Sequence, residues 1–174
     1  MIDKRTVFIL GAGASCPYGF PTARGLRRDI LDHFVGYYSS LIAPLAARQP
    51  DGPYPEIGHV TRFVDAFRRS NTESIDLFLS RQPAYQKVGK IAVLTAVLTK
   101  EKKSCFGEQM KVEDQPRDWY FYLYNRLTRE LVGKEAFRAF SGNGIAFVTF
   151  NYDRSLEHFL FDSLLCSYEG ATTQ

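Results

Sequence analysis

The chain has 174 residues, of which 45% are hydrophobic and 24% charged, and its formal net charge is +3. This composition is typical of a globular domain, and a chain of this length can bury enough apolar surface to fold without disulfides or a structural metal. The 22 basic residues are scattered among 19 acidic ones, whereas a nucleic-acid-binding surface concentrates its basic side chains. We therefore expect no direct binding of nucleic acid by this domain.

The cysteines and the apolar segments exclude further classes of protein. Cys16, Cys105 and Cys166 lie far apart, with no Cys-x-x-Cys pair or Cys/His cluster, so neither a zinc site nor a disulfide framework is expected. No segment approaches the roughly 18–20 apolar residues of a membrane span. The apolar run 7–10 is too short for the core of a signal peptide. These observations favour a cytoplasmic protein that needs no metal and does not bind a membrane.

The N-terminal half begins with a short apolar run and continues with helical patterns. Residues 6–10 favour a buried strand of a parallel sheet, which Gly11 ends. Apolar residues at intervals of about four along 24–42 predict an amphipathic helix. Residues 49–58 contain three prolines and two glycines and are predicted to form a loop. Further helical patterns lie at 63–67, 75–79 and 88–98.

The C-terminal half contains a second predicted strand between two helices. Residues 104–114 are polar and are predicted to form a loop. After a turn signal at 141–144, residues 145–150 favour a second buried strand, and 156–164 favour a final helix. The helix that precedes this strand is predicted to bury a stripe formed by Trp119, Leu123, Leu127 and Leu131.

These elements predict an α/β fold with a Rossmann-like parallel sheet and a helical insertion between its first two conserved strands. A parallel sheet usually has about four or more strands and is covered on both faces. Two strands therefore predict a sheet that is incomplete in this chain. We expect residues 1–166 to form one domain that is truncated at its C-terminal side, followed by a disordered tail at 167–174.

The first candidate site is the turn Gly11-Ala12-Gly13-Ala14-Ser15. Glycines after a strand tolerate positive φ and let backbone amides approach a diphosphate, and the Ser15 hydroxyl is a further donor. The dinucleotide fingerprint has a third glycine where this chain has Cys16, and no Gly-Lys-Ser/Thr follows, which argues against a Walker-type triphosphate site. The alternative is a tight turn that binds no ligand.

The second candidate site follows the second predicted strand. Ligands of open α/β sheets bind beyond the carboxyl ends of the strands, so this segment is expected to face the glycine turn. Asn151 offers an amide that can donate and accept hydrogen bonds, and Asp153 offers a carboxylate. The alternative is structural, because Asp153 is also placed to cap the next helix and Asn151 to form a turn.

Together the two segments resemble a known family. The sequences FILGAGASCPYGFPTARGL and FVTFNYDRSLEHFL are similar to the two conserved blocks of the sirtuin-like NAD-hydrolase domains of bacterial antiphage defence proteins. Gly19 to Thr22 match the end of the first block, and residues 74–79 are similar to a short helical segment between the blocks. The resemblance covers residues 5 to about 162.

The resemblance implies an NAD glycohydrolase that cleaves NAD to nicotinamide and ADP-ribose and acts as an effector of antiphage defence. Asn151 would hold the nicotinamide ribose and the attacking water, and Asp153 would orient the site. Positioned polar groups stabilise the oxocarbenium-like ribose that forms when nicotinamide leaves. A homo-oligomer, or a fused or associated sensor domain, is also implied. The positions implied to bind NAD are Gly11, Ala12, Gly13, Ala14, Ser15, Pro21, Thr22 and Asn151.

The chain departs from the family in two respects. It lacks the four-cysteine zinc module of true sirtuins, and Arg24 stands in a different context from their arginine, which disfavours protein deacylation. The family histidine lies downstream of the Asn-Tyr-Asp block, whereas His33 and His59 precede that block and His158 follows it too closely. We therefore expect this chain alone to be inactive.

Two alternatives remain open for the function. One is a non-catalytic module that binds NAD or an ADP-ribose nucleotide. The other is a Rossmann oxidoreductase, which the sequence favours less because the third glycine and an acidic residue to bind the ribose are missing.

Overall fold

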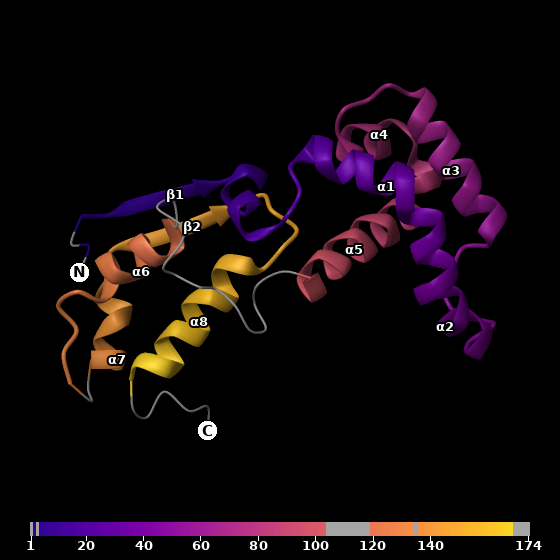
Figure 1. The fold of residues 1–174 in the computed structure, drawn as a ribbon. Helices are drawn as coiled ribbons and strands as arrows, with labels where there is room; N and C mark the ends of the chain where they lie inside the picture. The colour runs from indigo at the N-terminus through magenta and orange to yellow at the C-terminus, as the bar shows by residue number, and fades with distance from the viewer. Residues whose placement is uncertain (1, 3, 104–118, 134–135, 169–174) are drawn as a thin grey trace. The chain divides into compact units, whose positions relative to one another are not determined.

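The computed structural model describes residues 2, 4–103, 119–133 and 136–168. The chain divides into two compact units (Figure 1). The first consists of residues 1–19 and 104–174 and contains both strands, and the second consists of residues 20–103. The helical segment expected between the two strands therefore forms a compact unit of its own.

The first unit is built on two parallel strands. β1 (Thr6–Leu10) and β2 (Ile145–Thr149) pair in register from Thr6 opposite Ile145 to Leu10 opposite Thr149. The rings of Phe8 and Phe147, which are opposite each other in this register, stack with their centroids 5.3 Å apart. Both predicted strands and their parallel pairing are confirmed.

One face of this strand pair is exposed. Val7 is 60% exposed and Ile9 72% exposed, and Val148, which pairs with Ile9, is 45% exposed. Phe8 and Phe147 between them are half-buried, as expected when side chains alternate between the two faces of a sheet, whereas Thr149 at the end of β2 is exposed. The prediction that both strands are buried is therefore wrong. In the described part of the chain, only one face of the sheet is covered.

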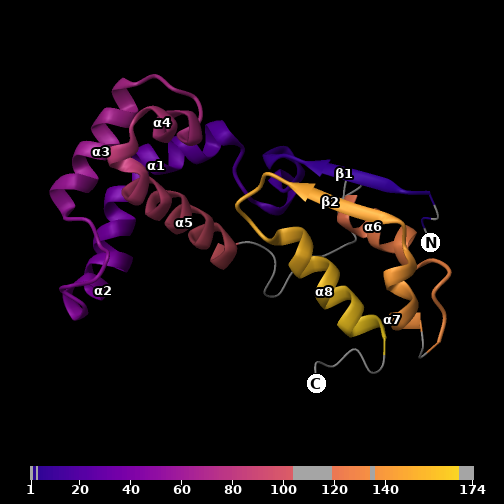
Figure 2. The same ribbon diagram turned by 180° about the vertical axis from the view of Figure 1, so that it is seen from behind.

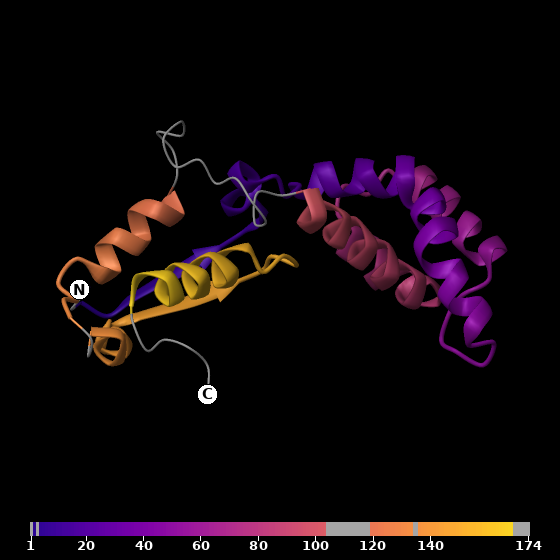
Figure 3. The ribbon, with the colours of Figure 1, turned by 60° about the horizontal axis from the view of Figure 1, so that its bottom comes forward.

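Helices complete the first unit. α6 (Trp119–Thr128), α7 (Ala136–Ala139) and α8 (Ser155–Ser167) belong to it. Figures 2 and 3 both show α6 and α8 beside the strand pair. α6 buries Tyr120, Leu123 and Leu127, so the buried stripe begins at Tyr120 and not at the predicted Trp119. The Tyr124 hydroxyl ties α6 to α8 through a 2.9 Å hydrogen bond to the Ser163 carbonyl oxygen.

The second unit is helical. The predicted helix over 24–42 is confirmed as α1 (Ala23–Tyr37) and a π-helical turn (Tyr38–Ile42), and the loop at 49–58 as a non-helical stretch that ends where α3 begins. The other helices are α2 (Ala43–Arg48), α3 (Ile57–Arg69), α4 (Ile75–Arg81) and α5 (Gln86–Lys103). The largest fully buried apolar side chains of this unit are Ile30, Phe34, Val60, Phe63, Phe67 and Val88.

Two further predictions concern segments that lie wholly or partly outside the described residues. The predicted loop at 104–114 lies outside them. Of the predicted tail, Ser167 is the last residue of α8, and 169–174 lie outside the described residues. Among the residues that are described, no helix is both long enough and apolar enough to cross a membrane.

Candidate functional site

The two candidate segments, the glycine turn and the Asn-Tyr-Asp segment, meet at one edge of the sheet. Parallel strands end on the same side, and Leu10 pairs with Thr149 at that end. The Phe150 amide continues the pairing by donating a 3.0 Å hydrogen bond to the Leu10 carbonyl oxygen. The glycine turn after β1 and the Asn-Tyr-Asp segment after β2 therefore leave the sheet side by side, as expected for a ligand site beyond the strand ends.

A serine and an aspartate join these two segments directly. The Ser15 hydroxyl donates a 2.7 Å hydrogen bond to Asp153 Oδ2, although it also lies 3.4 Å from the Ala12 carbonyl oxygen. A hydroxyl has one proton, and the shorter contact to a carboxylate is the stronger one. Ser15 is 1% exposed. In this structure its hydroxyl therefore holds the two segments together, and its predicted contact with a diphosphate stays a prediction.

The second carboxylate oxygen of Asp153 accepts hydrogen bonds from the first residue of the following helix. Asp153 Oδ1 accepts a 3.1 Å hydrogen bond from the Ser155 backbone amide and a short one from the Ser155 hydroxyl. Ser155 is the first residue of α8. One carboxylate oxygen of Asp153 therefore binds the start of α8, as the structural alternative expected, and the other binds Ser15, while the role of Asp153 in a ligand site stays a prediction.

Aromatic residues of α6 form hydrogen bonds that stabilise this network. The Tyr120 hydroxyl lies 2.6 Å from Ser155 Oγ, and since the Ser155 proton is already donated to Asp153, Tyr120 is the donor. The Tyr120 ring stacks on Tyr18 at 3.7 Å between centroids, and its backbone amide donates to the Tyr18 hydroxyl. The Trp119 indole donates a 2.8 Å hydrogen bond to the Ala14 carbonyl oxygen.

No functional role was predicted from the sequence for Tyr18, Trp119, Tyr120 or Ser155. Aromatic side chains are common in cores, and Tyr120 is 35 positions from Ser155 and 102 from Tyr18. The one available signal was the spacing of Ser155 two residues after Asp153, which is typical of an aspartate that accepts from a nearby backbone amide. The aromatic support of the network follows from tertiary structure alone.

Asn151 is the least satisfied member of the network. Its Nδ2 atom lies 3.4 Å from Ser15 Oγ, and its backbone amide donates to Thr149 Oγ1. Its Oδ1 atom is buried and has no hydrogen-bond partner among the described residues. A buried amide oxygen without a donor costs free energy, about 1–3 kcal/mol in mutational series. The described residues therefore leave the hydrogen-bonding capacity of this atom unfilled.

The glycine turn presents backbone donors to solvent. Ala12–Ala14 form a short 3-10 helix in which the Ala14 amide donates to the Gly11 carbonyl oxygen. Within the part of the chain that is described, the amides of Ala12 and Gly13 donate no hydrogen bond. Gly13 is exposed and Ala12 half-buried. The turn therefore offers two adjacent donors, the kind of group that binds a phosphate oxygen.

Neither Gly11 nor Gly13 is required by the fold itself. The expected positive φ is absent, because Gly11 has φ −107° and Gly13 is not among the glycines with positive φ. A Cβ atom built on either glycine would meet nothing within 4 Å. The tolerance of glycine for positive φ is therefore not used at Gly11 or Gly13. The absence of side chains at 11 and 13 leaves space over the turn that no other part of the described chain fills.

The two remaining predicted NAD-binding residues belong to the second unit. Thr22 caps α1 by accepting a 3.2 Å hydrogen bond from the Gly25 amide, and Pro21 precedes it. This capping role needs no ligand. A contact of Pro21 or Thr22 with NAD stays a prediction.

Each of the three histidines contacts a residue other than Ser15, Asn151 and Asp153. His33 is paired with Asp29 on α1, and the His59 ring packs against Tyr85. The His158 Nδ1 atom lies 3.3 Å from Asp162 on α8, with half of its side chain exposed. Within the described residues, no three or more His, Cys, Asp or Glu side chains are grouped to hold a metal ion.

Comparison of the chain with models of protein families, with curated proteins and with solved structures found no match.

Proposed function

We propose that the first unit binds NAD across the strand ends and positions its nicotinamide ribose for hydrolysis, as in the sirtuin-like NAD hydrolases that the two sequence blocks resemble. In this proposal β1 and β2 are the first strands of a Rossmann-like sheet. The link to antiphage defence, and a homo-oligomer or a sensor domain as partner, rest on the resemblance.

The observation that carries the proposal is the buried, unpartnered Oδ1 atom of Asn151. Ribose hydroxyls are donors, and a catalytic water is also a donor, so either one satisfies this oxygen. The atom lies on the residue that the family resemblance assigns to the nicotinamide ribose. The empty space over Gly11 and Gly13, with the free amides of Ala12 and Gly13 beneath it, supports a diphosphate at the neighbouring position.

The roles of the residues follow from their hydrogen bonds. The amides of Ala12 and Gly13 bind a diphosphate oxygen. Asn151 orients the ribose and the attacking water through Oδ1, which lowers the entropic cost of bringing water to the anomeric carbon. Asp153 is a positioning residue: it fixes Ser15, and Ser15 in turn accepts from Asn151 Nδ2 and so directs the amide.

The sharpest test replaces Gly13 with alanine. A methyl group at position 13 meets no atom within 4 Å, so Gly13→Ala is expected to keep or slightly raise the free energy of unfolding. The same methyl group occupies the space over the turn amides and is expected to weaken NAD binding by about tenfold or more, since it displaces a charge-assisted hydrogen bond. The measurement is titration calorimetry with NAD, beside thermal denaturation.

Gly142→Ala is the matched control. Gly142, like Gly13, belongs to a short 3-10 helix, lacks a positive φ and has open space at its Cβ position. We expect it to change stability like Gly13→Ala and to leave NAD affinity unchanged. Equal NAD affinities in both variants and the parent protein would overturn the proposed site.

Asn151→Ala tests the ribose contact separately. ADP has the diphosphate but no nicotinamide ribose, so the variant is expected to weaken binding of NAD by about three- to tenfold and to leave binding of ADP nearly unchanged. Asn125→Ala, which removes an exposed amide on α6, is the control. An equal loss for NAD and ADP would contradict the assigned role of Asn151.

A second candidate function is a module that binds NAD or an ADP-ribose nucleotide without cleaving it. It is favoured by the departure of the sequence from the family, because His33 and His59 precede the Asn-Tyr-Asp block and His158 follows it too closely. Nicotinamide release, measured by chromatography, separates the two functions. Release above the rate of Asn151→Ala supports the hydrolase, and tight NAD binding with no release supports the binding module.

A further inference from the structure

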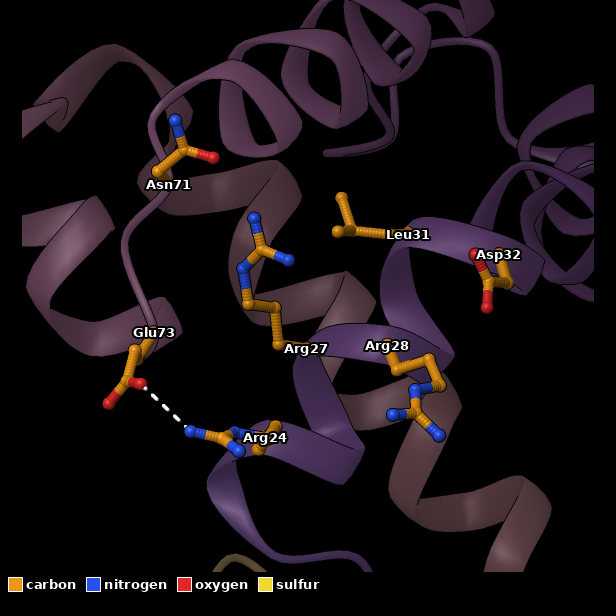
Figure 4. Close-up of a pocket in the computed structure, with 7 residues that line it drawn as sticks. All are labelled: Arg24, Arg27, Arg28, Leu31, Asp32, Asn71 and Glu73. Atoms are coloured by element: carbon orange, nitrogen blue, oxygen red, sulfur yellow. Dashed lines mark hydrogen bonds and ion pairs between the residues drawn. The ribbon is translucent and has the colours of Figure 1, made fainter.

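A cavity in the second unit is lined by three arginines from one helix. It has a volume of about 490 Å³ and lies between α1 and the segment that joins α3 to α4 (Figure 4). Arg24, Arg27 and Arg28 lie at positions i, i+3 and i+4 of α1, and such positions share one face of a helix. Like charges at this spacing destabilise a helix, by about 0.2–0.5 kcal/mol per pair, so their placement needs a reason beyond α1 itself.

Arg27 is held in place without a carboxylate. Its Nε donates a 2.9 Å hydrogen bond to the Thr72 carbonyl oxygen, and an Nη atom lies 3.4 Å from the Arg68 carbonyl oxygen. Its guanidinium also stands over the Phe67 ring at 5.3 Å from the centroid. These contacts fix the position of the guanidinium and neutralise none of its charge.

The other two arginines leave the cavity with excess positive charge. Arg24 forms an exposed 3.1 Å ion pair with Glu73, and Arg28 has no ion pair or hydrogen bond among the described residues. Three guanidinium groups line the cavity against two carboxylates, those of Asp32 and Glu73, which leaves a net charge of +1. Asn71, in the left-handed conformation at φ 50°, adds an amide at the opposite wall.

We propose that this cavity binds a ligand that carries a diphosphate group. Its volume is in the usual range for small-molecule sites, and its lining is charged where such sites are usually apolar, so the ligand itself is charged. Guanidinium groups bind phosphate oxygens through paired hydrogen bonds, and Figure 4 shows the guanidinium groups of Arg27 and Arg28 directed to different parts of the cavity, where each can bind a separate phosphate group of one ligand. All residues that line this cavity belong to the second unit, whereas the glycine turn and Asn151 belong to the first.

The test uses inorganic pyrophosphate and titration calorimetry on the 174-residue protein with Gly13→Ala in the background, so that binding at the glycine turn is weakened. Arg28→Ala is expected to weaken binding by about tenfold or more, which corresponds to loss of a hydrogen bond to a charged group. Arg28→Lys keeps the charge and loses the paired geometry. Its affinity for pyrophosphate is expected to lie between that of Arg28→Ala and that of the protein with Arg28 intact. Glu73→Gln is expected to tighten binding, because it removes a negative charge and frees Arg24.

Arg62→Ala is the matched control, since Arg62 is an exposed arginine on α3 that does not line the cavity. Arg28 is exposed and without a partner, so its truncation leaves the fold intact, which thermal denaturation checks. If Arg28→Ala and Arg62→Ala weakened pyrophosphate binding equally, the affinity would depend on net charge alone, and the proposal would be overturned. An unchanged affinity in Arg28→Ala, or in Glu73→Gln, would overturn it as well.

Discussion

Ser15 and Asp153 are 138 positions apart in the sequence and are joined by a 2.7 Å hydrogen bond from Oγ to Oδ2. The bond links the turn that follows β1 to the segment that follows β2. The other oxygen of the same carboxylate accepts from the backbone amide and the hydroxyl of Ser155. A single side chain therefore connects both sequence motifs to the first turn of α8.

Removal of the Ser15 hydroxyl is expected to lower the free energy of unfolding. Ser15→Ala leaves Asp153 Oδ2 and Asn151 Nδ2 without their shared partner in a buried position, at a cost of about 1–3 kcal/mol in the free energy of unfolding. Chemical denaturation of Ser15→Ala, Asp153→Asn and the double variant measures the coupling, expected at about 0.5–3 kcal/mol. Additive effects of the two substitutions would show that the bond does not couple the segments.

The hydroxyl of Tyr120 is expected to stabilise the network from α6. Tyr120→Phe keeps the ring stacked on Tyr18 and removes only the donor to Ser155, so we expect a loss of about 1 kcal/mol in the free energy of unfolding. Tyr122→Phe is the control on the same helix, because Tyr122 is 71% exposed. Equal free energies of unfolding for the two variants would contradict the assigned hydrogen bond.

A buried carboxylate joins α1 to α5 in the second unit. Asp29 Oδ1 lies 3.2 Å from Lys100 Nζ, whereas its Oδ2 is buried without a partner among the described residues. Lys100→Met leaves the buried carboxylate of Asp29 with only His33 beside it and is expected to cost about 3 kcal/mol in the free energy of unfolding. Asp29→Leu combined with Lys100→Met removes both charges and is expected to restore most of the stability. Denaturant titration measures each; a double variant no more stable than Lys100→Met would contradict this account.

Alkaline pH is expected to weaken the second unit through Tyr38. Burial raises the pKa of its phenol above the ordinary value of 10.0, with a smaller contribution from Tyr54, and the hydroxyl donates to the Pro55 carbonyl oxygen. Because the folded-state pKa is the higher one, the contribution of Tyr38 is complete below pH 10.0 and is lost as the pH rises through the folded-state value.

The measurement for Tyr38 is the free energy of unfolding between about pH 9 and about pH 12. Tyr38→Phe is expected to be less stable than the parent protein at the lower end, and the difference is expected to narrow as the pH rises. Tyr122→Phe, at an exposed position in the first unit, serves as the control. A difference that stays constant across this range would show that ionisation of Tyr38 does not affect folding.

The periodic elements could be predicted from the sequence because their signals are local. The short apolar runs at 6–10 and 145–150 became β1 and β2, and the four-residue spacing along 24–42 became α1 and its π-helical turn. The burial of the strands could not be predicted in the same way. An apolar run shows that a side chain can be buried, and the cover over Val7 and Ile9 depends on which other segments pack there.

Part of the candidate site could likewise be predicted from the sequence, and part depends on tertiary structure. The sequence by itself determined the glycine turn, the polar residues after the second strand and, through the rule for parallel strands, their common edge. Only the tertiary structure decided that Asp153 bonds to Ser15, that Tyr120 supports it from α6, and that Asn151 Oδ1 is left unpartnered. Hydrogen-bond pairing across long separations depends on how the helices pack against the sheet, and no local pattern in the sequence encodes which donor reaches which acceptor.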